Sequence, residues 1–441
     1  MKRHASFLGV ILVAGLMGCQ GPGNSLGSPS FVTAHESSPF GVLTALATRY
    51  MGTPDLAKSA VSKMASAGIC WDREDFYWAT VEYTKGQFNW GPFDDAVDKD
   101  LNAGIDVLGL LVYGAAWWHT PINDKVMSPL TDQMASDWSD YVRAVVERYK
   151  DQVHYWEIWN EENFPLFWSP QPNPSDYVRL LAAAHAAITS VAPGSKIVMG
   201  GTANIDTNYI QQVYNNGGGN YFDILAVHPY EESLPDSYSS GSSYPSSFVE
   251  NIADLNAQFP GKPIWLTEMG WATSSTSDQL QADYLVRMYV QMLALPEVQK
   301  VFWYDFRDDA TGDPWEDTKG LVHRDSTLSL KTSYKAYQTM TSVLEGASFQ
   351  NQVQGPNIDS GNGLGDDIYQ YRFVNGKNTI VVVWLSGQVS ATGVRSVTVN
   401  NIMTSSATLV TLTGGSQTVT VVNGQYAVGA SQAPLYLIFG P

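Results

Sequence analysis

The sequence predicts a (β/α)8 TIM barrel of the α/β class, followed by a small C-terminal antiparallel β-sandwich. Eight short apolar runs alternate with helical patterns from residue 40 to about residue 342, which is the signature of β-α units. No glycine-rich phosphate loop follows the first run, so the alternative of a doubly wound open sheet is less well supported. From about Phe349 the sequence changes to short runs rich in Val, Ile, Tyr and Thr, separated by turns such as Asn375-Gly376. The predicted barrel covers residues 40–345 and the predicted sandwich covers residues 346–441.

The first 39 residues have the composition of a targeting segment and a spacer. Lys2 and Arg3 precede an apolar run over residues 7–17 and then Cys19, which is the pattern of a bacterial lipoprotein signal over residues 1–19. That run is too short to span a bilayer as a helix. Residues 20–39 are rich in Gly, Ser and Pro and predict a flexible tether. We expect a lipid anchor at Cys19 and a place at the bacterial cell envelope; an ordinary secretory signal, and hence a secreted protein, is the alternative.

Charge and cysteine content exclude several classes of function. The 441 residues include 43 acidic and 25 basic side chains, giving a formal net charge of −18, and a protein this acidic is a poor ligand for nucleic acid. Only two cysteines are present, which argues against a cysteine-based zinc site. No nucleotide-binding fingerprint supports a redox enzyme. We expect a monomer without a metal or another cofactor.

Each barrel strand is predicted from a run of β-branched and aromatic residues. The eight runs are residues 40–43, 68–71, 105–112, 153–159, 196–199, 224–227, 263–266 and 301–304. Two intervening segments carry apolar residues at helical spacing, one from Trp138 to Tyr149 and one from Tyr177 to Val191. The sandwich strands are predicted at residues 367–374, 379–385, 394–399, 407–412, 417–422 and 434–439.

Two of the predicted barrel strands, the fourth and the seventh, are followed by a glutamate. Residues 153–163 read VHYWEIWNEEN, so an apolar run leads to Asn160 and Glu161, and residues 263–271 read PIWLTEMGW, with Glu268 at the corresponding place. A carboxylate is costly to bury without partners, so polar groups directly after an apolar strand are expected to face a cleft. A lone Asn-Glu pair is most simply a polar turn, but a second stretch of the same build favours a shared site at the C-terminal strand ends.

Paired carboxylates at adjoining strand ends are what the cleavage of a glycosidic bond requires. One is protonated and donates to the leaving oxygen, while the other is ionised and attacks or stabilises the oxocarbenium-like centre. Glu157 and Glu162 are the rival carboxylates. Glu157 lies inside the strand, where burial and pairing are expected, and Glu162 follows Glu161 and is expected to point elsewhere.

Other predicted strand ends supply candidate cleft residues. Arg73 follows the second strand and is suited to hold a carboxylate bidentately, although a surface salt bridge is the alternative interpretation. Aromatic residues that either stack on sugar rings or form the core of a loop follow the third strand, namely Tyr113, Trp117 and Trp118. His228 and Tyr230 follow the sixth strand, and Trp303 belongs to the eighth. The acidic stretch 308–317 fits no EF-hand and is interpreted as a solvated loop.

The motifs around the two glutamates resemble those of clan A glycoside hydrolases, most of all glycoside hydrolase family 39 and related bacterial exopolysaccharide endoglycosidases. The resemblance rests on residues 156–161 (WEIWNE), Asn163 and residues 265–270 (WLTEMG), and it extends to residues 85–90 (KGQFNW) and 226–230 (AVHPY). It implies a retaining, endo-acting β-glycosidase whose partner is a polysaccharide or oligosaccharide substrate. The predicted trailing β-sandwich is also similar to that of family 39 enzymes.

The resemblance also implies roles for single residues. Glu161 would be the general acid/base and Glu268 the nucleophile, with their carboxyl groups about 5 Å apart. Asn160 would hydrogen-bond the sugar hydroxyl next to the reacting carbon. The other predicted substrate-site residues hold Glu268, line the site, form its floor or stack on sugars: Arg73, Tyr230, His228, Trp303 and Trp117. Two residues depart from the family pattern, since Asp72 occupies a position expected to be apolar and Glu162 adds a carboxylate beside Glu161.

A second hypothesis belongs to a different functional class. A catalytically idle carbohydrate-binding or exopolysaccharide-assembly lipoprotein would also have a barrel and a membrane tether. An idle site has no need for both glutamates in these settings. The two hypotheses differ in one observable, because a binder retains polymer without releasing reducing ends.

Overall fold

The computed structural model describes most of the chain. The described residues are 35–115, 117–118, 129–230, 235, 248–354, 368–385 and 394–440. The predicted signal peptide, Cys19 and residues 20–34 of the predicted tether lie outside these ranges. Within them, no helix combines the length and the apolar character that a membrane crossing needs.

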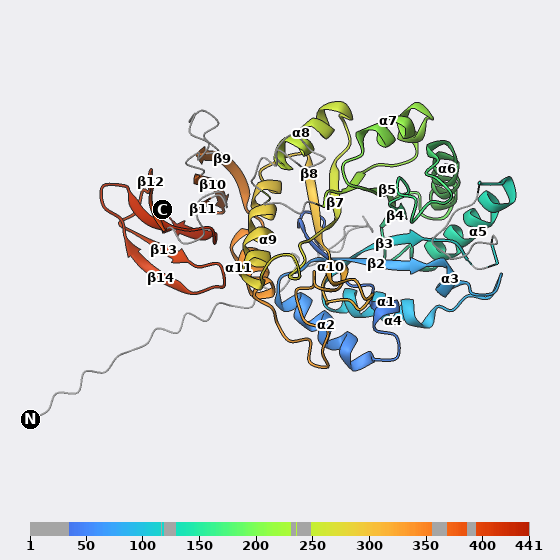
Figure 1. The fold of residues 1–441 in the computed structure, drawn as a ribbon, viewed down its shortest axis with the longest axis horizontal. Coiled ribbons are helices and arrows are strands. Elements are labelled where there is room, and N and C mark those ends of the chain that lie inside the picture. Colours follow the sequence, from blue (N-terminus) through green and yellow to red (C-terminus); the bar gives the residue numbers. More distant parts are fainter. Residues whose placement is uncertain are drawn as a thin grey trace, which may run out of the picture.

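Eight parallel strands close into a barrel, which confirms the predicted fold class (Figure 1). In order they are β1 (Phe40–Leu43), β2 (Trp71–Tyr77), β3 (Asp106–Val112), β4 (Tyr155–Asn160), β5 (Lys196–Ala203), β6 (Leu225–His228), β7 (Ile264–Met269) and β8 (Val298–Trp303). β1 pairs with both β2 and β8, and this double pairing closes the ring. At that seam Gly41 is required, because a Cβ would lie 2.6 Å from the ring of Phe302.

Helices surround the barrel, as Figure 1 shows. They are α1 (Leu46–Arg49), α2 (Pro54–Ser66), α3 (Trp78–Val81), α4 (Gly91–Asn102), α5 (Asp132–Tyr149), α6 (Pro174–Val191), α7 (Thr207–Asn215), the 3-10 turn η1 (Gly218–Asn220), α8 (Phe248–Gln258), α9 (Asp278–Met292), α10 (Pro314–Asp317) and α11 (Thr332–Leu344). The two helices predicted from apolar spacing are α5 and α6. α6 begins where Asn173 caps it by accepting from the backbone of Ser175 and Asp176.

The N-terminal end of the barrel is filled by side chains. Trp71, Trp265 and Phe302 belong to one buried cluster there, and the ring centroids of Trp71 and Trp265 lie 5.7 Å apart. Lys300 Nζ lies 4.1 Å from the Trp71 ring and donates to the backbone of Glu36. Because this end is packed, the polar residues of the barrel interior gather at the opposite, C-terminal end.

The second strand differs from its prediction. It was predicted at residues 68–71, but β2 begins at Trp71 and includes Asp72, Arg73 and Glu74. All three charged side chains are fully buried, because each has a partner on a neighbouring element. Asp72 accepts from the backbone and hydroxyl of Thr44, and Glu74 accepts from backbone amides at the start of α1. Local apolarity could not reveal a strand whose charges are satisfied by the tertiary fold.

The C-terminal part is a two-sheet sandwich, as predicted. One sheet has the order β14-β13-β16-β11-β10-β9 and the other pairs β12 with β15. The strands are β9 (Ser348–Gln354), β10 (Ile368–Asn375), β11 (Asn378–Leu385), β12 (Arg395–Val399), β13 (Ser406–Val410), β14 (Ser416–Thr420), β15 (Tyr426–Ala430) and β16 (Leu435–Phe439). β9 and β15 were not predicted. Apolar side chains of both sheets form a separate core that includes Val383, Val397 and Val428.

The sandwich packs against the barrel on the side of α9 and α11 (Figure 1). Tyr369, Tyr371 and Trp384 stack on one another and belong to the same buried cluster as the barrel helices. Arg287 of α9 is fully buried, and its guanidinium Nε donates to the backbone oxygen of Gln432 at 3.0 Å. The two parts therefore share a continuous interface.

Candidate active site

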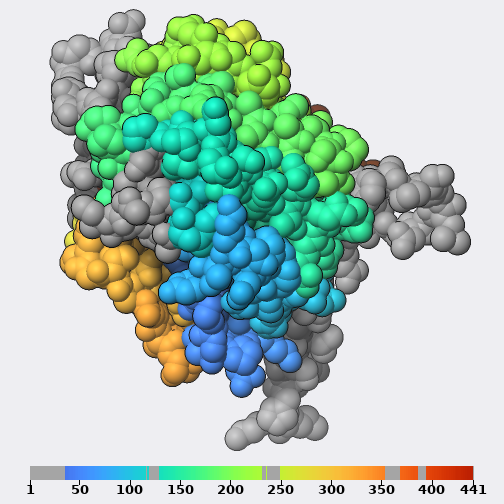
Figure 2. All heavy atoms as spheres, turned by 90° about the vertical axis from the view of Figure 1, so that its right-hand side faces the viewer, coloured from blue at the N-terminus to red at the C-terminus, as the bar shows by residue number. Residues whose placement is uncertain are grey.

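A cavity of about 710 Å³ opens at the C-terminal ends of the barrel strands. Residues from strands β2 to β8 and the segments that follow them line it, among them Arg73, Asp75, Tyr113, Asn160, Glu161, Phe164, Leu166, Phe167, Tyr230, Glu268, Tyr304 and Trp315. Figure 2 shows the molecule from the side toward which β2 and β3 run, with the segment after β8, in orange, beside the first β-α units, in blue. The cavity lies where a TIM barrel carries its chemistry.

Glu161 and Glu268 converge at this cavity. One carboxylate oxygen of each, together with a ring nitrogen of His228, lie within 4.8 Å of one another. Glu268 lies in β7, and Glu161 directly follows β4. Three such groups also satisfy the distance criterion for a metal site. Arg73 is already bound to Glu268, however, and its positive charge disfavours a cation at this place.

The backbone at Glu161 has a strained conformation, and its side chain faces the cavity. Its φ is 50°, in the left-handed region that favours glycine. Hydrogen bonds on both sides hold it there: its N–H donates to Gly201 O at 2.9 Å, and its own carbonyl accepts from Phe164 N at 2.9 Å. The apolar strand β4 thus ends in a fixed turn that aims the Glu161 side chain.

Arg73 is the centre of the polar network under the cavity. Its side chain is fully buried, and its three nitrogens donate to Glu157 Oε2 at 2.6 Å, Glu268 Oε1 at 2.6 Å and Asn160 Oδ1 at 3.0 Å. One planar guanidinium therefore fixes three side chains from two strands. The alternative of a surface salt bridge is excluded by this burial.

Glu268 is held in its ionised form. Burial alone would raise the pKa of Glu268, but the electrostatic effect of neighbouring His228 and Arg73, with hydrogen bonds from Tyr230 and Arg73, lowers it below its ordinary value. Tyr230 Oη donates to Glu268 Oε2 at 2.9 Å. Both carboxylate oxygens of Glu268 thus have a donor, which favours the charged form.

His228 connects Glu161 to the barrel interior. Its Nδ1 lies 3.0 Å from Glu161 Oε1, and its Nε2 lies 3.0 Å from Thr267 Oγ1. The Thr267 hydroxyl donates its one proton to Glu157 at 2.9 Å, so His228 Nε2 must be the donor to Thr267. In the neutral ring Nδ1 is then an acceptor, which suits a protonated Glu161. Gly201 makes room for this ring, because a Cβ there would overlap the imidazole.

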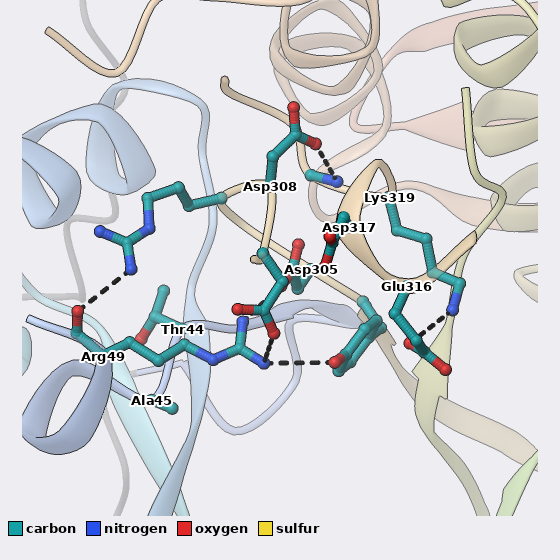
Figure 3. A network of polar contacts seen from close by, with 12 residues as sticks. Thr44, Ala45, Arg49, Asp305, Asp308, Glu316, Asp317 and Lys319 are labelled. Carbon is teal, nitrogen blue, oxygen red and sulfur yellow. Dashed lines mark hydrogen bonds and ion pairs between the residues drawn. The ribbon is translucent and has the colours of Figure 1, made fainter. Parts of the chain in front are cut away.

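The wall after β8 is charged and aromatic (Figure 3). Arg49 bonds to Asp305 and Tyr304, and its Nη2 lies 3.0 Å from Asp309. Tyr304, Asp309 and Trp315 line the cavity, whereas residues 308–317 were interpreted as a solvated loop. Residues 310–314 are exposed, as expected of a solvated loop, but the fold brings the segment against Arg49 of α1, so that part of it also lines the cavity.

Behind that wall, a buried lysine packs against the aromatic rings. Lys319 is fully buried, and its Nζ lies 5.0 Å from the Tyr230 ring centroid and 5.3 Å from that of Tyr304. It also pairs with Glu316 at 2.8 Å (Figure 3). Burial lowers the pKa of Lys319.

Two predicted aromatic contacts lie away from the cavity. Trp303 is fully buried and donates from Nε1 to Lys319 O at 3.0 Å, while the next residue, Tyr304, lines the cavity in its place. Trp117 packs edge-on against Trp78 and donates to Glu82 O at 3.0 Å. Neither tryptophan is among the described residues that line the cavity, so the predicted floor and stacking roles need correction.

The remaining acidic residues singled out in the sequence are structural. Glu157 is fully buried and paired with Arg73, as expected for a residue inside a strand. Glu162 is also fully buried and points away from the cavity toward Gly200, where a Cβ would overlap its carboxylate. Burial raises the pKa of Glu162 well above its ordinary value, so it is held neutral. Asp72 points to Thr44, outside the barrel interior.

Sequence reasoning missed several cavity residues. Asp75 faces the cavity two residues after Arg73 on the same strand, and the alternation of β2 would have placed both on one face had the strand been extended. Arg49 and Trp315 gave no local signal, because they belong to short helices, α1 and α10, in the connections after β1 and β8. Phe164 and Leu166 lie three and five residues after Glu161 and were not predicted to line the cavity.

Two family models match parts of the chain. The model described as "Glycosyl hydrolase catalytic core" matches residues 133–337, and "Glycosyl hydrolase family 10" matches residues 42–165. The first match includes both Glu161 and Glu268. These matches confirm the resemblance to clan A glycoside hydrolases.

Curated relatives match over shorter segments. An endo-1,4-beta-xylanase from Gibberella zeae is 27% identical over 86 residues, and a beta-1,4-xylanase from Dictyoglomus thermophilum is 24% identical over 102 residues. These segments cover 19% and 23% of the chain and only 23% and 26% of the relatives.

Solved structures share the whole architecture. A family 39 glycoside hydrolase from Bacteroides cellulosilyticus is 24% identical, with a TM-score of 0.73 over 92% of this chain and 81% of that one. A monomeric beta-xylosidase from Caulobacter crescentus is 14% identical, with a TM-score of 0.65 over 92% of this chain and 96% of that one. At these identities the likeness establishes the fold.

Proposed function

We propose that this protein is a retaining β-glycoside hydrolase, acting within a polysaccharide or oligosaccharide chain. The observation that carries the proposal is the convergence of Glu161 and Glu268 at one cavity, with carboxylate oxygens within 4.8 Å. Retaining glycosidases have carboxyl groups about 5 Å apart, whereas inverting enzymes leave room for a water between them. Their environments also differ, because Arg73 and Tyr230 bind Glu268 while His228 binds Glu161.

The proposed reaction has two displacements. A carboxylate oxygen of Glu268 attacks the anomeric carbon, the bond to the leaving oxygen breaks, and Glu161 gives that oxygen its proton. Water then attacks the same carbon, Glu161 takes a proton from this water, and the bond to Glu268 breaks. Asn160 lies next to Glu161 and lines the cavity, where its amide is placed for a sugar hydroxyl. Its side chain cannot turn freely, because it accepts from Arg73 and donates to Tyr113 at 3.0 Å.

The xylanase relatives make xylan the first polymer to try. Both curated relatives carry a β-1,4-xylanase name, and one of the similar structures is a beta-xylosidase. Mannan, β-glucan and bacterial exopolysaccharides complete the set, because the matches are partial. Action within the chain is proposed from the endo-xylanase relative and is tested by the size distribution of the products.

The decisive experiment compares wild type with Glu268→Ala and Glu161→Gln on these polymers. We expect reducing ends from wild type and a loss of at least about a thousandfold in both variants. Azide should rescue Glu268→Ala and give a product of inverted configuration, read by proton NMR of the anomeric signal. Glu147→Gln, on the exposed face of α5, is the matched control and should keep full activity. Near wild-type rates in either active-site variant would refute the assignment, and polymer retained without reducing ends would support an idle binder instead.

We further propose that the protein is tethered to the bacterial cell envelope through Cys19. The motif before Cys19 and the tether composition support this. In a bacterial host, wild type should fractionate with membranes and Cys19→Ala should not acquire lipid, as mass spectrometry of the mature N-terminus would show. A wild-type N-terminus cut elsewhere and free of lipid would contradict the anchor.

A further inference from the structure

Three apolar side chains form one part of the cavity wall, beside Glu161. They are Phe164, Leu166 and Phe167, which we name the apolar shelf. Phe164 is 46% exposed and Leu166 is 54% exposed, and they are among the few large apolar side chains with such exposure in the described chain. Water-facing apolar surface inside a cavity is a common feature of binding sites, because a ligand gains free energy by covering it.

The shelf is held rigidly. The turn after Glu161 is closed by bonds from Phe167 N and Trp168 N to Phe164 O, both at 3.0 Å. The ring of Phe167 stacks on Tyr113 at 5.8 Å and 9°. Phe164 follows Glu161 by three residues, and its N–H donates to the Glu161 carbonyl. The position of the shelf is therefore coupled to that of the Glu161 carboxyl group.

The rest of the wall has a different character. On the side of β8, Arg49, Asp309 and Glu316 bring charged groups to the cavity. On the side of β2, Asp75 brings a carboxylate whose Oδ1 is buried and has no hydrogen-bond partner among the described residues. The cavity thus has an exposed apolar surface at the shelf, whereas charged side chains line it on the sides of β2 and β8, so these parts suit different parts of a substrate.

We propose that the apolar shelf binds the leaving group, and that this group is a sugar residue that lies on the shelf with its C–H face. This inference rests on the proposed function, because a general acid protonates the leaving oxygen and must therefore lie on the leaving-group side of the scissile bond. The face of a pyranose ring is apolar and matches a Phe or Leu side chain, whereas its hydroxyls point outward to solvent or polar groups. A charged leaving group would find no counter-charge on the shelf itself.

The test compares two leaving groups, one that contains a sugar ring and one that does not. Xylan and xylo-oligosaccharides release a sugar, whereas β-xylobiosyl fluoride releases fluoride, which is too small to reach the shelf. If the polymer screen identifies a sugar other than xylose, the glycosyl fluoride of that sugar replaces β-xylobiosyl fluoride. We expect Phe164→Ala with Leu166→Ala to lower kcat/KM on the polymer about tenfold or more. The same double variant should hydrolyse the fluoride within about twofold of wild type. Phe164→Trp, which keeps a large apolar side chain at this position, should hydrolyse the polymer at the wild-type rate.

Tyr83→Ala is the matched control, because Tyr83 is 77% exposed and does not line the cavity. Equal losses on polymer and fluoride, or no loss on the polymer, would overturn the inference while leaving the proposed function intact. A wild-type protein that releases neither sugar nor fluoride would overturn the proposed function, and this inference with it.

Discussion

Arg73 Nη1 lies 2.6 Å from Glu268 Oε1, although the two residues are 195 positions apart in the sequence. The arginine is fully buried and also binds Glu157 and Asn160. Its charge compensates for the burial of Glu268, which would otherwise be neutral. This single relationship links the second, fourth and seventh strands into one site.

Replacing Arg73 with Lys should slow catalysis and shift its pH dependence. A lysine keeps the charge but cannot donate to three partners in one plane. The Glu268 carboxylate would therefore be held less precisely, and its ionised form would be less stabilised. We expect kcat/KM to fall about a hundredfold and its acidic limb to move to higher pH, because the pKa of Glu268 rises. The measurement is kcat/KM from pH 3 to 8, with Arg148→Lys on the surface as control. An unchanged acidic limb would contradict the role of Arg73.

Tyr230→Phe should have a smaller effect of the same kind. The hydroxyl donates to Glu268 Oε2, and its loss removes one hydrogen bond to the ionised carboxylate. We expect about a tenfold loss in kcat/KM and a rise in the pKa of Glu268. Tyr304→Phe serves as control, because its hydroxyl accepts from Arg49 and, in the described part of the chain, forms no hydrogen bond to either glutamate. Equal effects of the two substitutions would argue against a specific role for Tyr230.

Thr267→Val should impair only reactions whose leaving group needs a proton. Without the hydroxyl, His228 Nε2 loses its acceptor and the ring is no longer fixed with Nδ1 ready to accept from Glu161. We expect kcat/KM on a polymer to fall about tenfold, with little change on a glycosyl fluoride, whose leaving group departs without protonation. Thr267→Ser should retain activity on both. A parallel loss on both substrates would show that Thr267 acts on folding or on Glu268.

Asp72 should make the protein less stable as the pH rises. Burial raises the pKa of Asp72 to about 7, despite hydrogen bonds from Thr44. The unfolded chain releases this proton near pH 4, so between that pH and about 7 the native state binds more protons, and stability falls as pH increases. In this window, replacing Asp72 with Asn should make the free energy of unfolding fall less steeply with pH, by up to about 1.4 kcal/mol per pH unit.

Thermal unfolding from pH 4.5 to 8 measures this dependence. Between pH 4.5 and about 7 the melting temperature of wild type should fall more steeply, or rise less steeply, than that of Asp72→Asn. Asp55→Asn, at an exposed position on α2, should follow wild type. Parallel curves for wild type and Asp72→Asn would show that another group governs the pH dependence; buried Asp100, whose pKa burial also raises, would be the next to test.

The sequence by itself determined the barrel, the sandwich and the two glutamates at the cavity. Alternating apolar runs and helical stripes are local patterns, and so is a glutamate at the end of an apolar strand. The sequence also predicted the partners of Glu268: Arg73 as a residue suited to hold a carboxylate, and both Arg73 and Tyr230 through the resemblance to a known family. It did not predict that β2 contains three buried charged residues, because nothing local distinguishes a satisfied buried charge from a solvated one.

Only the tertiary structure decided which side chains share the cavity. Trp303 and Tyr304 are neighbours in sequence, yet one is buried behind the wall and the other lines it. Arg49 and Asp309 meet at the cavity from opposite ends of the barrel chain because β1 closes on β8. Such contacts depend on ring closure and on the course of long loops, which involve distances in space that no local pattern along the chain encodes.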